Sequence, residues 1–374
     1  MRRTILPTVF SSFLKRFFNG FTRPAQKHFR CYVLGLILMI RFRSIQRIAN
    51  TVGQGQVDAL HHFLHDGAWD HREVIRQSRE AVMCKLPKDK DALLVIDDTP
   101  IERHGPEIEG AGCHHGPRGL LWGQCAVTAV VRSGSMNLFW DVKGYRPKKT
   151  CAVKDFRSKI DLAQEILREA DLFGRDFTVV MDSWYACKRI LNQIADLRWT
   201  FVTSVRSNRL VVINGHKTRA ANLTKGPHVY QEVRLPNGRT VLATERLAYL
   251  PGFGTVKVVI GKTRHDRRFM ITNDLDLSMA QVVRTYAQRV WIETTHENVK
   301  QHLGLGELHV RSWRAAQRHW ALALVAHNAL VLWDAARPVG DGRRTFGQII
   351  RDFRDQYERP HRRRPCTKTL QLAA

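Results

Sequence analysis

The sequence predicts a mixed α/β fold with a β-rich insertion, preceded by an all-helical N-terminal region. Residues 1–88 carry helix signals and no alternating strand pattern. From Ala92 onward, short continuous apolar runs alternate with amphipathic stretches. Runs of this length bounded by turn residues are typical of buried strands, and this order of elements favours a sheet covered by helices.

Two short helices are predicted in the N-terminal region. Ser44 is a suitable N-cap for a helix over 45–52, Gly53 and Gly55 follow it, and a second periodic run covers 57–64. Three arginines lie before and within the first of these helices: Arg41, Arg43 and Arg47. A short helix pair with a glycine-containing turn resembles a helix-turn-helix, so residues 1–88 are interpreted as a DNA-binding domain.

Residues 89–207 supply the first part of the predicted core. A buried strand over 93–96 ends in Asp97-Asp98-Thr99-Pro100. The further predicted strands are 125–131, 137–142, 177–181 and 199–205, and the predicted helices are 156–172 and 187–197. Three strands, a helix, a strand, a helix and a strand are the order expected for a mixed sheet of the ribonuclease-H kind.

The second half of the chain begins with the β-rich insertion, residues 208–275, where strand-like pieces alternate with turns such as Pro236-Asn237-Gly238. Residues 276–335 are expected to complete the core with two helices, one over 286–300 and an apolar one over 315–333. The tail, 336–374, is basic and contains Arg362-Arg363-Arg364 between prolines. It is predicted to be solvated and partly disordered.

The charge balance points to a polyanionic partner. The chain has 60 Lys and Arg against 34 Asp and Glu, a formal net charge of +26 and a pI near 10.4. Neutralising DNA phosphates releases condensed counterions, so such an excess favours nucleic acid. The longest apolar run, 31–40, has ten residues and is too short to span a bilayer. With no evident signal-peptide cleavage site, we expect a cytoplasmic nucleic-acid-binding protein without a membrane partner.

The seven cysteines give no sign of a disulfide framework. Their number is odd and none has the CxxC spacing of metal or redox motifs, which fits a reducing compartment. Cys113-His114-His115 could suggest zinc. A second ligand pair at structural-site spacing is missing, so zinc is not predicted.

Four polar residues near the end of the predicted core share the spacing of one helical face. Tyr286, Arg289, Glu293 and Lys300 lie at offsets 0, 3, 7 and 14, where an amphipathic helix normally carries apolar residues. Arg289 and Glu293, four residues apart, could form only a solvated surface ion pair. The whole pattern instead indicates a carboxylate flanked by groups that bind phosphate.

Acids at strand ends could join Glu293 in one cluster. In open α/β sheets, sites assemble at the carboxyl ends of strands, here at Asp97-Asp98 and at Asp182. Three close carboxylates need a cation, and hard oxygen ligands suit two Mg²⁺ or Mn²⁺ ions. Three alternatives stay open. If the strand continues, Asp97 and Asp98 face opposite sides and only one can bind the metal. Asp182 could be only a turn residue, and Glu297 could take the place of Glu293.

The sequence resembles the DDE insertion-sequence transposases in three motifs. These are Asp-Asp-Thr at a strand end, an Asp-x-x-Tyr block and the Tyr-Arg-Glu-Lys spacing. The resemblance is to the IS-four-like group and its IS-seven-hundred-and-one relatives, and it covers roughly residues 92–305. It implies that Asp98, the acid before the threonine, is the first catalytic metal ligand, with Asp182 bridging two ions and Glu293 as the third. It also implies that three residues contact DNA near the cleaved end: Tyr286, Arg289 and Lys300.

The activity implied by this resemblance is two successive phosphoryl transfers, in which a transposon end is cleaved and then joined to target DNA. The implied partners are double-stranded DNA, as terminal inverted repeats and target, and a second copy of the chain. One alternative is a ribonuclease-H-like endonuclease or resolvase that cuts without joining. Another is a DNA-binding regulator with inert acids. Trp184 and Trp291 could contact a base, although aromatic residues at such positions more often serve packing.

Overall fold

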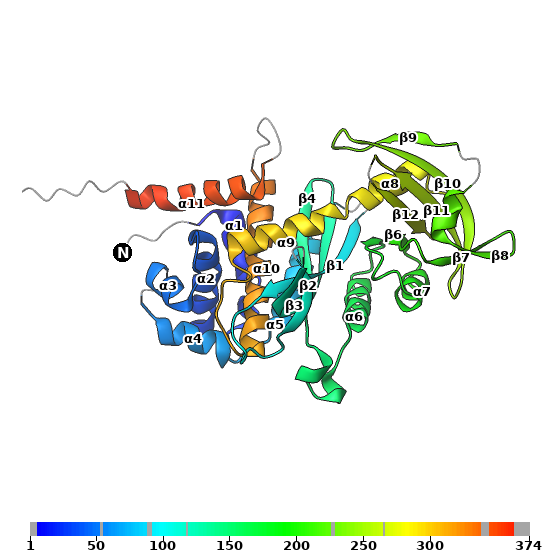
Figure 1. Ribbon diagram of the computed structural model, residues 1–374. Helices are drawn as coiled ribbons and strands as arrows, with labels where there is room; N and C mark the ends of the chain where they lie inside the picture. The colour runs from blue at the N-terminus through cyan, green and yellow to red at the C-terminus, as the bar shows by residue number, and fades with distance from the viewer. Residues whose placement is uncertain are drawn as a thin grey trace, which may run out of the picture.

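The structure is a computed structural model that describes residues 6–52, 55–87, 92–116, 119–225, 229–264, 266–337 and 344–362. Gly53 and the Arg363-Arg364 part of the basic run lie outside these residues. The molecule is elongated, with a helical end, a central sheet and a β-rich end (Figure 1). The predicted α/β class with N-terminal helices is confirmed.

The helical end surrounds one long buried helix. The N-terminal helices are α1 (Thr8–Lys15), α2 (Arg23–Leu38), α3 (Ile45–Thr51), α4 (Val57–His65) and α5 (His71–Met83). Helices α1, α2, α4 and α5 contact α10 (Trp313–Ala335), and α3 packs on α2 and α4. Helix α10 also contacts strand β4 (Met136–Tyr145) (Figure 1). As predicted, Ser44 caps α3, because its side chain accepts a hydrogen bond from the Arg47 amide at 3.2 Å. Helix α10 therefore ties the N-terminal helices to the sheet.

The twelve strands of the described residues belong to one sheet. Besides β4, they are β1 (Leu93–Glu102), β2 (Gly112–Gly116), β3 (Gly119–Ser133), β5 (Thr178–Met181), β6 (Thr200–Val205), β7 (Leu210–Ile213), β8 (His216–Arg219), β9 (Gln231–Arg234), β10 (Thr240–Leu250), β11 (Gly254–Lys262) and β12 (Arg267–Thr272). The central order is β4-β3-β1-β5-β6, with β1, β5 and β6 parallel and β3 and β4 antiparallel. The insertion continues this sheet, because β12 pairs with β6 and leads to β11, β10, β7 and β8.

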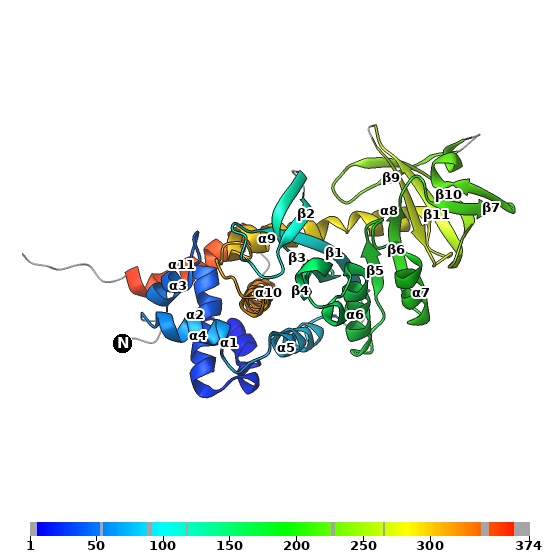
Figure 2. The same ribbon diagram turned by 60° about the horizontal axis from the view of Figure 1, so that its bottom comes forward.

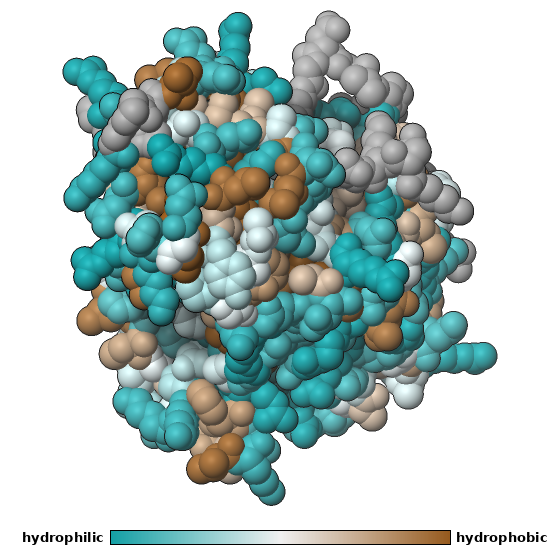
Figure 3. Space-filling model, turned by 90° about the vertical axis from the view of Figure 1, so that its right-hand side faces the viewer, coloured by the Kyte–Doolittle hydropathy of each residue, from teal (hydrophilic) through white to brown (hydrophobic). Residues whose placement is uncertain are grey.

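Helices cover both faces of the central strands. On one face lie α6 (Lys159–Asp171) and α7 (Lys188–Asp196), and on the other α8 (Met279–Ala287) and α9 (Val290–Leu303) (Figure 2). Viewed from the β-rich end, the surface is mostly hydrophilic with scattered apolar groups (Figure 3). Within the described residues, no helix combines the length and apolar character needed to cross a membrane.

Strand β1 is longer than predicted. The sequence predicted an end at Ile96, but the strand continues through Asp97 and Asp98 to Glu102. Its pairing with β5 stops at Ile96 opposite Met181, whereas β3 pairs with it over its whole length. The continuous β3 edge supplies hydrogen-bond partners that the local Asp-Asp-Thr-Pro sequence does not reveal.

The predicted single helix over 286–300 is wrong. Helix α8 ends at Ala287 and α9 begins at Val290. The amides of Gln288, Arg289 and Trp291 bond to carbonyls three residues back, which tightens the chain at the junction. Tyr286 is therefore on a different helix from Glu293 and Lys300.

The prediction that the tail is solvated and partly disordered is also wrong for residues 346–362. Residues Phe346–Arg362 form helix α11, which lies against α2, α9 and α10 (Figure 1). Its buried residues are Phe346, Ile349, Ile350 and Phe353. These four have helical spacing, and their apolar face outweighs the basic composition that suggested disorder.

Buried neutral histidines should make the fold sensitive to acid. His327 on α10 is 2% exposed, and burial lowers its pKa to about 4. The unfolded chain takes up a proton near pH 6.5 and the folded chain only near 4, so stability falls as pH drops through this range. When the pH falls from 7.5 to 5, the unfolding free energy should decrease by about 2 kcal/mol more in the wild type than in His327→Leu.

Urea unfolding at several pH values measures this difference. The matched control is His61→Leu, since His61 on α4 is exposed. An identical pH dependence for the wild type and His327→Leu would contradict the assignment.

Candidate active site

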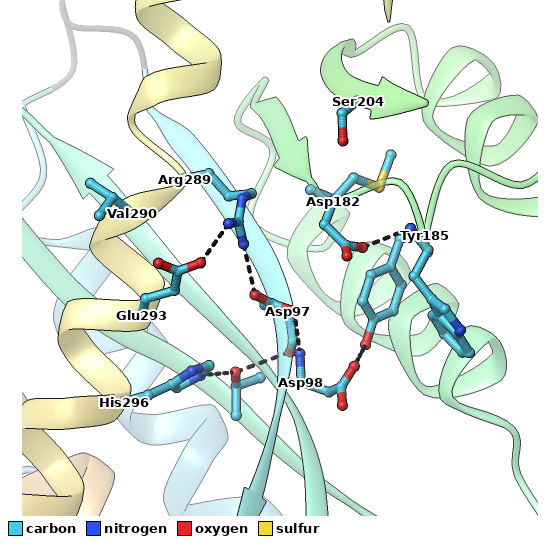
Figure 4. A network of polar contacts seen from close by, with 12 residues as sticks. Asp97, Asp98, Asp182, Tyr185, Ser204, Arg289, Val290, Glu293 and His296 are labelled. Atoms are coloured by element: carbon cyan, nitrogen blue, oxygen red, sulfur yellow. Dashed lines mark hydrogen bonds and ion pairs between the residues drawn. The ribbon is translucent and has the colours of Figure 1, made fainter. Parts of the chain in front are cut away.

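Strand register brings two aspartates together. The last β1–β5 pair is Ile96 with Met181, so Asp97 and Asp182 are the next residues along the two parallel strands. In-register residues of parallel strands place their side chains on the same face, and successive residues alternate faces. Asp97 and Asp182 are therefore neighbours on the face covered by α8 and α9 (Figure 4).

One guanidinium joins this pair to α9. Arg289, at the N-cap of α9, donates from Nη1 to Asp97 Oδ2 at 3.1 Å and from Nη2 to Glu293 Oε1 at 2.5 Å (Figure 4). The Arg289 and Asp97 side chains are each 19% exposed and that of Glu293 is 47% exposed. Arg289 thus holds one carboxylate from β1 and one from α9.

Burial dominates the electrostatics of Asp97. Desolvation raises the pKa of its carboxyl to about 7, with further upward contributions from Asp182 and Asp98. The Asp98 amide, which donates to Asp97 at 2.8 Å, and the Arg289 guanidinium both oppose this shift. Burial alone would lower the pKa of Arg289, but Glu293, Tyr286 and Asp97 raise it above its usual value.

Asp182 also shows the local role that its position suggested. Its Oδ1 accepts a hydrogen bond from the Trp184 amide at 2.8 Å, as in a turn after a strand. That bond fixes the carboxylate next to Asp97 (Figure 4).

Asp98 lies on the opposite face of β1. Its carboxylate accepts from Lys159 Nζ of α6 at 2.6 Å, from the Tyr185 hydroxyl at 3.2 Å and from the Cys125 thiol at 3.5 Å. The structure thus groups Asp97, and not Asp98, with Asp182, Arg289 and Glu293. The role of Asp98 as the first catalytic acid stays a prediction from the resemblance.

His296 supports the site from beneath. Its Nε2 lies 2.6 Å from Thr128 Oγ1, which in turn donates to the carbonyl of Asp97 at 3.1 Å. Burial lowers the pKa of His296 to about 3, so the ring is neutral. Nothing in the sequence singled out His296 or Lys159, since both reach the aspartates only through tertiary packing.

The other residues of the polar pattern are apart from the acids. Tyr286 is buried and its hydroxyl donates to Ser204 Oγ at 2.9 Å. Lys300 donates to the Pro100 carbonyl at 2.8 Å, near the end of β1, and burial lowers its pKa. Glu297 is exposed on α9. The predicted DNA contacts of Tyr286, Arg289 and Lys300 stay predictions.

No metal-binding group is assembled in this arrangement of the described residues, since no three of their acidic, histidine or cysteine side chains are close enough to hold an ion. Carboxylate oxygens are nevertheless the donors that Mg²⁺ and Mn²⁺ prefer. Between Asp97 and Glu293, the neutralising cation is Arg289.

Arg289→Gln should destabilise the fold more at pH 8 than at pH 5.5. At pH 5.5 Asp97 is largely protonated, whereas at pH 8 its buried carboxylate would lack its cation. The loss of unfolding free energy should differ between the two pH values by about 1 kcal/mol.

The control variant for this urea-unfolding experiment is Arg189→Gln. Arg189 pairs with Asp161 at 2.6 Å. Burial raises the pKa of Asp161, but hydrogen bonds from Ser158 and Arg189 outweigh this and lower it, so Asp161 is ionised at both pH values. Equal losses at the two pH values for Arg289→Gln would overturn the coupling to Asp97.

Comparison with known proteins agrees with the predicted family. Residues 16–249 match the family described as DDE superfamily endonuclease. That segment includes Asp97, Asp98 and Asp182 and ends before Arg289 and Glu293. The "Probable transposase for insertion sequence element IS701" of Microchaete diplosiphon is 26% identical over 193 residues, which cover 50% of each chain. The chain thus spans about half the length of that relative. Since the family match covers more than half of the 374 residues, this chain belongs to the DDE superfamily endonucleases.

Proposed function

We propose that this chain is a DNA transposase that cleaves the ends of an insertion sequence and joins them to target DNA. The observation that carries the proposal is that Arg289 joins Asp97 of β1 to Glu293 of α9 while Asp182 follows β5 next to Asp97, in a chain of an endonuclease family. The relative named as a probable insertion-sequence transposase supports joining as well as cutting.

The strand order supports a ribonuclease-H-like core. An antiparallel meander, β1, β3 and β4, is followed by β5 and β6 parallel to β1, with helices on both faces. The first two acids are on β1 and just after β5, and the third is on α9, which packs on β1. This arrangement agrees with the order of elements expected from the sequence.

Asp97, Asp182 and Glu293 are the residues that would hold two Mg²⁺ or Mn²⁺ ions. Their oxygens are suitable ligands, and the raised pKa of Asp97 reflects a buried carboxyl next to another acid, a setting that a cation stabilises. Bound ions would activate the attacking oxygen and neutralise charge on the phosphate. We favour Asp97 over Asp98 because Asp98 faces Lys159 and Tyr185.

The protein's own groups would position the DNA. With the acids neutralised by metal, the Arg289 guanidinium is free to donate two hydrogen bonds to a phosphate. Lys300, farther along α9, supplies a second cation for the same strand. Neutral His296 keeps Thr128 bonded to the Asp97 carbonyl and so holds β1 in place.

The remaining positive charge would bind the DNA outside the reacting bonds. The α3–α4 pair, with Arg41 and Arg47 exposed, is the proposed DNA-binding element of the N-terminal helices. The insertion, residues 208–275, has 12 Lys and Arg against 4 Asp and Glu and would extend this surface. Since two transposon ends must be paired, the proposed active form is a homodimer.

Removing an acid of the site should abolish cleavage. We expect Asp97→Asn, Asp182→Asn and Glu293→Gln each to slow Mg²⁺-dependent cleavage by at least about 100-fold. The matched controls are Asp98→Asn and Glu297→Gln, which should keep most of the activity. The substrate is a DNA duplex that carries one end of the insertion sequence, taken from the DNA next to the gene.

The products separate the competing functions. Strand transfer of pre-cut ends into a target plasmid supports the transposase, and cleavage without joining supports a nuclease or resolvase. Inactive Asp98→Asn with active Asp97→Asn would restore Asp98 as the first acid, if both variants have wild-type melting temperatures. Unchanged cleavage in all three acid variants would overturn the proposal.

Metal binding should also be visible without turnover. Because Mn²⁺ must displace Arg289 from Asp97 and Glu293, Arg289→Gln should show a larger Mn²⁺-induced rise in melting temperature than the wild type. Asp182→Asn should lose the rise, and Arg284→Gln, an exposed arginine on α8, should match the wild type. No Mn²⁺ effect in any variant would contradict a metal site at these acids.

A further inference from the structure

A cavity of about 490 Å³ lies beyond the acids, at the C-terminal end of α9. Four segments line it: the loop before α3, the end of β1 with the residues after it, the start of β3, and residues 300–309. Its lining includes Phe42, Ile101, Arg103, Leu121, Lys300 and His309. The cavity thus lies between the N-terminal helices and the strand that carries Asp97.

Arg103 is a buried cation with unused bonding capacity. The residue is 3% exposed, with Nε bonded to Gln124 Oε1 at 3.1 Å and Nη1 to the Gly306 carbonyl at 2.6 Å. Its Nη2 is buried and has no hydrogen-bond partner among the described residues. Burial lowers the pKa of Arg103 to about 10, so the group remains charged. An isolated buried charge is costly unless an anion pairs with it.

Lys300 adds a second cation to the same cavity. Its ammonium bonds to the Pro100 carbonyl, and within the described parts of the chain neither Lys300 nor Arg103 forms a salt bridge. The two carboxylates of the lining do not neutralise them. Glu307 is bound by the Arg43 guanidinium at 2.8 Å and the Arg43 amide at 3.0 Å, and Glu102 is exposed. Among the described residues, the cavity lining therefore includes two cations, Arg103 and Lys300, that no salt bridge neutralises.

Phe42 gives the cavity an aromatic wall. The side chain is 69% exposed, and its φ of 55° is in the left-handed region, which bulky residues rarely adopt. The Arg47 guanidinium lies 5.3 Å from the ring centre. Strain at an exposed aromatic residue beside a cationic cavity is typical of a ligand contact.

We propose that this cavity binds one nucleotide of the DNA strand that enters the active site. Its phosphate would pair with Arg103 and Lys300, and its base would stack on Phe42. This inference rests on the proposed function. Lys300 is seven residues beyond Glu293 on α9, roughly 10 Å along the helix. That distance corresponds to about three steps of a DNA strand.

The test measures binding of a cleaved transposon-end duplex over a range of salt concentrations. Arg103→Gln should weaken binding about tenfold at moderate salt and reduce the slope of log K against log salt by about 1. Its melting temperature without DNA is measured as well, because the variant removes a buried charge but also the hydrogen bonds to Gln124 and Gly306; a weaker binding at a melting temperature near that of the wild type supports the phosphate contact. The matched control is Arg168→Gln on the exposed surface of α6, which should alter neither quantity.

A second variant tests the aromatic contact without a risk to folding. Phe42→Asn removes the ring from an exposed position, and asparagine tolerates positive φ, so the melting temperature should be equal or higher. Binding should weaken at least about fivefold with the salt slope unchanged. If Arg103→Gln acts and Phe42→Asn does not, the base contact is overturned.

An unchanged salt slope for Arg103→Gln would overturn the phosphate site. In that case wild-type cleavage that depends on Asp97, Asp182 and Glu293 would leave the proposed function intact. Wild-type protein that neither binds nor cleaves transposon ends would instead refute the proposed function together with this site.

Discussion

The pairing of β1 with β5 fixes the geometry on which the site depends. The parallel register ends at Ile96 and Met181, so the next residues, Asp97 and Asp182, are neighbours on the same face. Strand β3 holds β1 straight for six more residues. A shift of one residue in this register would bring Asp98 to the face of α9 and turn Asp97 toward α6.

Arg289 offsets the electrostatic cost of placing Asp97 and Asp182 side by side. Two neighbouring aspartates in a half-buried position repel each other, and desolvation already raises the pKa of Asp97. A guanidinium shared by Asp97 and Glu293 offsets this cost and also fixes the start of α9 against β1. Arg289 lies at the junction, between the end of α8 at Ala287 and the start of α9 at Val290.

The other end of α9 is tied to the N-terminal helices. Arg43, fully buried before α3, donates to Glu307 and to the carbonyls of His302 and Leu36. One helix is therefore anchored at its start to Asp97, an acid of the proposed active site, and at its end to the proposed DNA-binding region. The cavity lined by Phe42, Arg103 and Lys300 is at this second anchor, where DNA held by both parts would pass.

Local sequence determined which elements exist. Apolar runs, the Ser44 cap and the helical periodicity of residues 315–333 placed most strands and helices within a few residues, because those signals act over one or two turns. Asp-Asp-Thr at a strand end, the Asp-x-x-Tyr block and the Tyr-Arg-Glu-Lys spacing indicated the family to which the chain belongs. Only the tertiary structure decided four features. These are the length of β1, which of Asp97 and Asp98 faces α9, the break between α8 and α9, and the folding of the C-terminal segment into helix α11. Three of these depend on partners distant in sequence: β3 for β1, β5 for the aspartates, and α2, α9 and α10 for α11. Local patterns carry no information about which distant partner is present, and that partner sets the side chains that meet at the site.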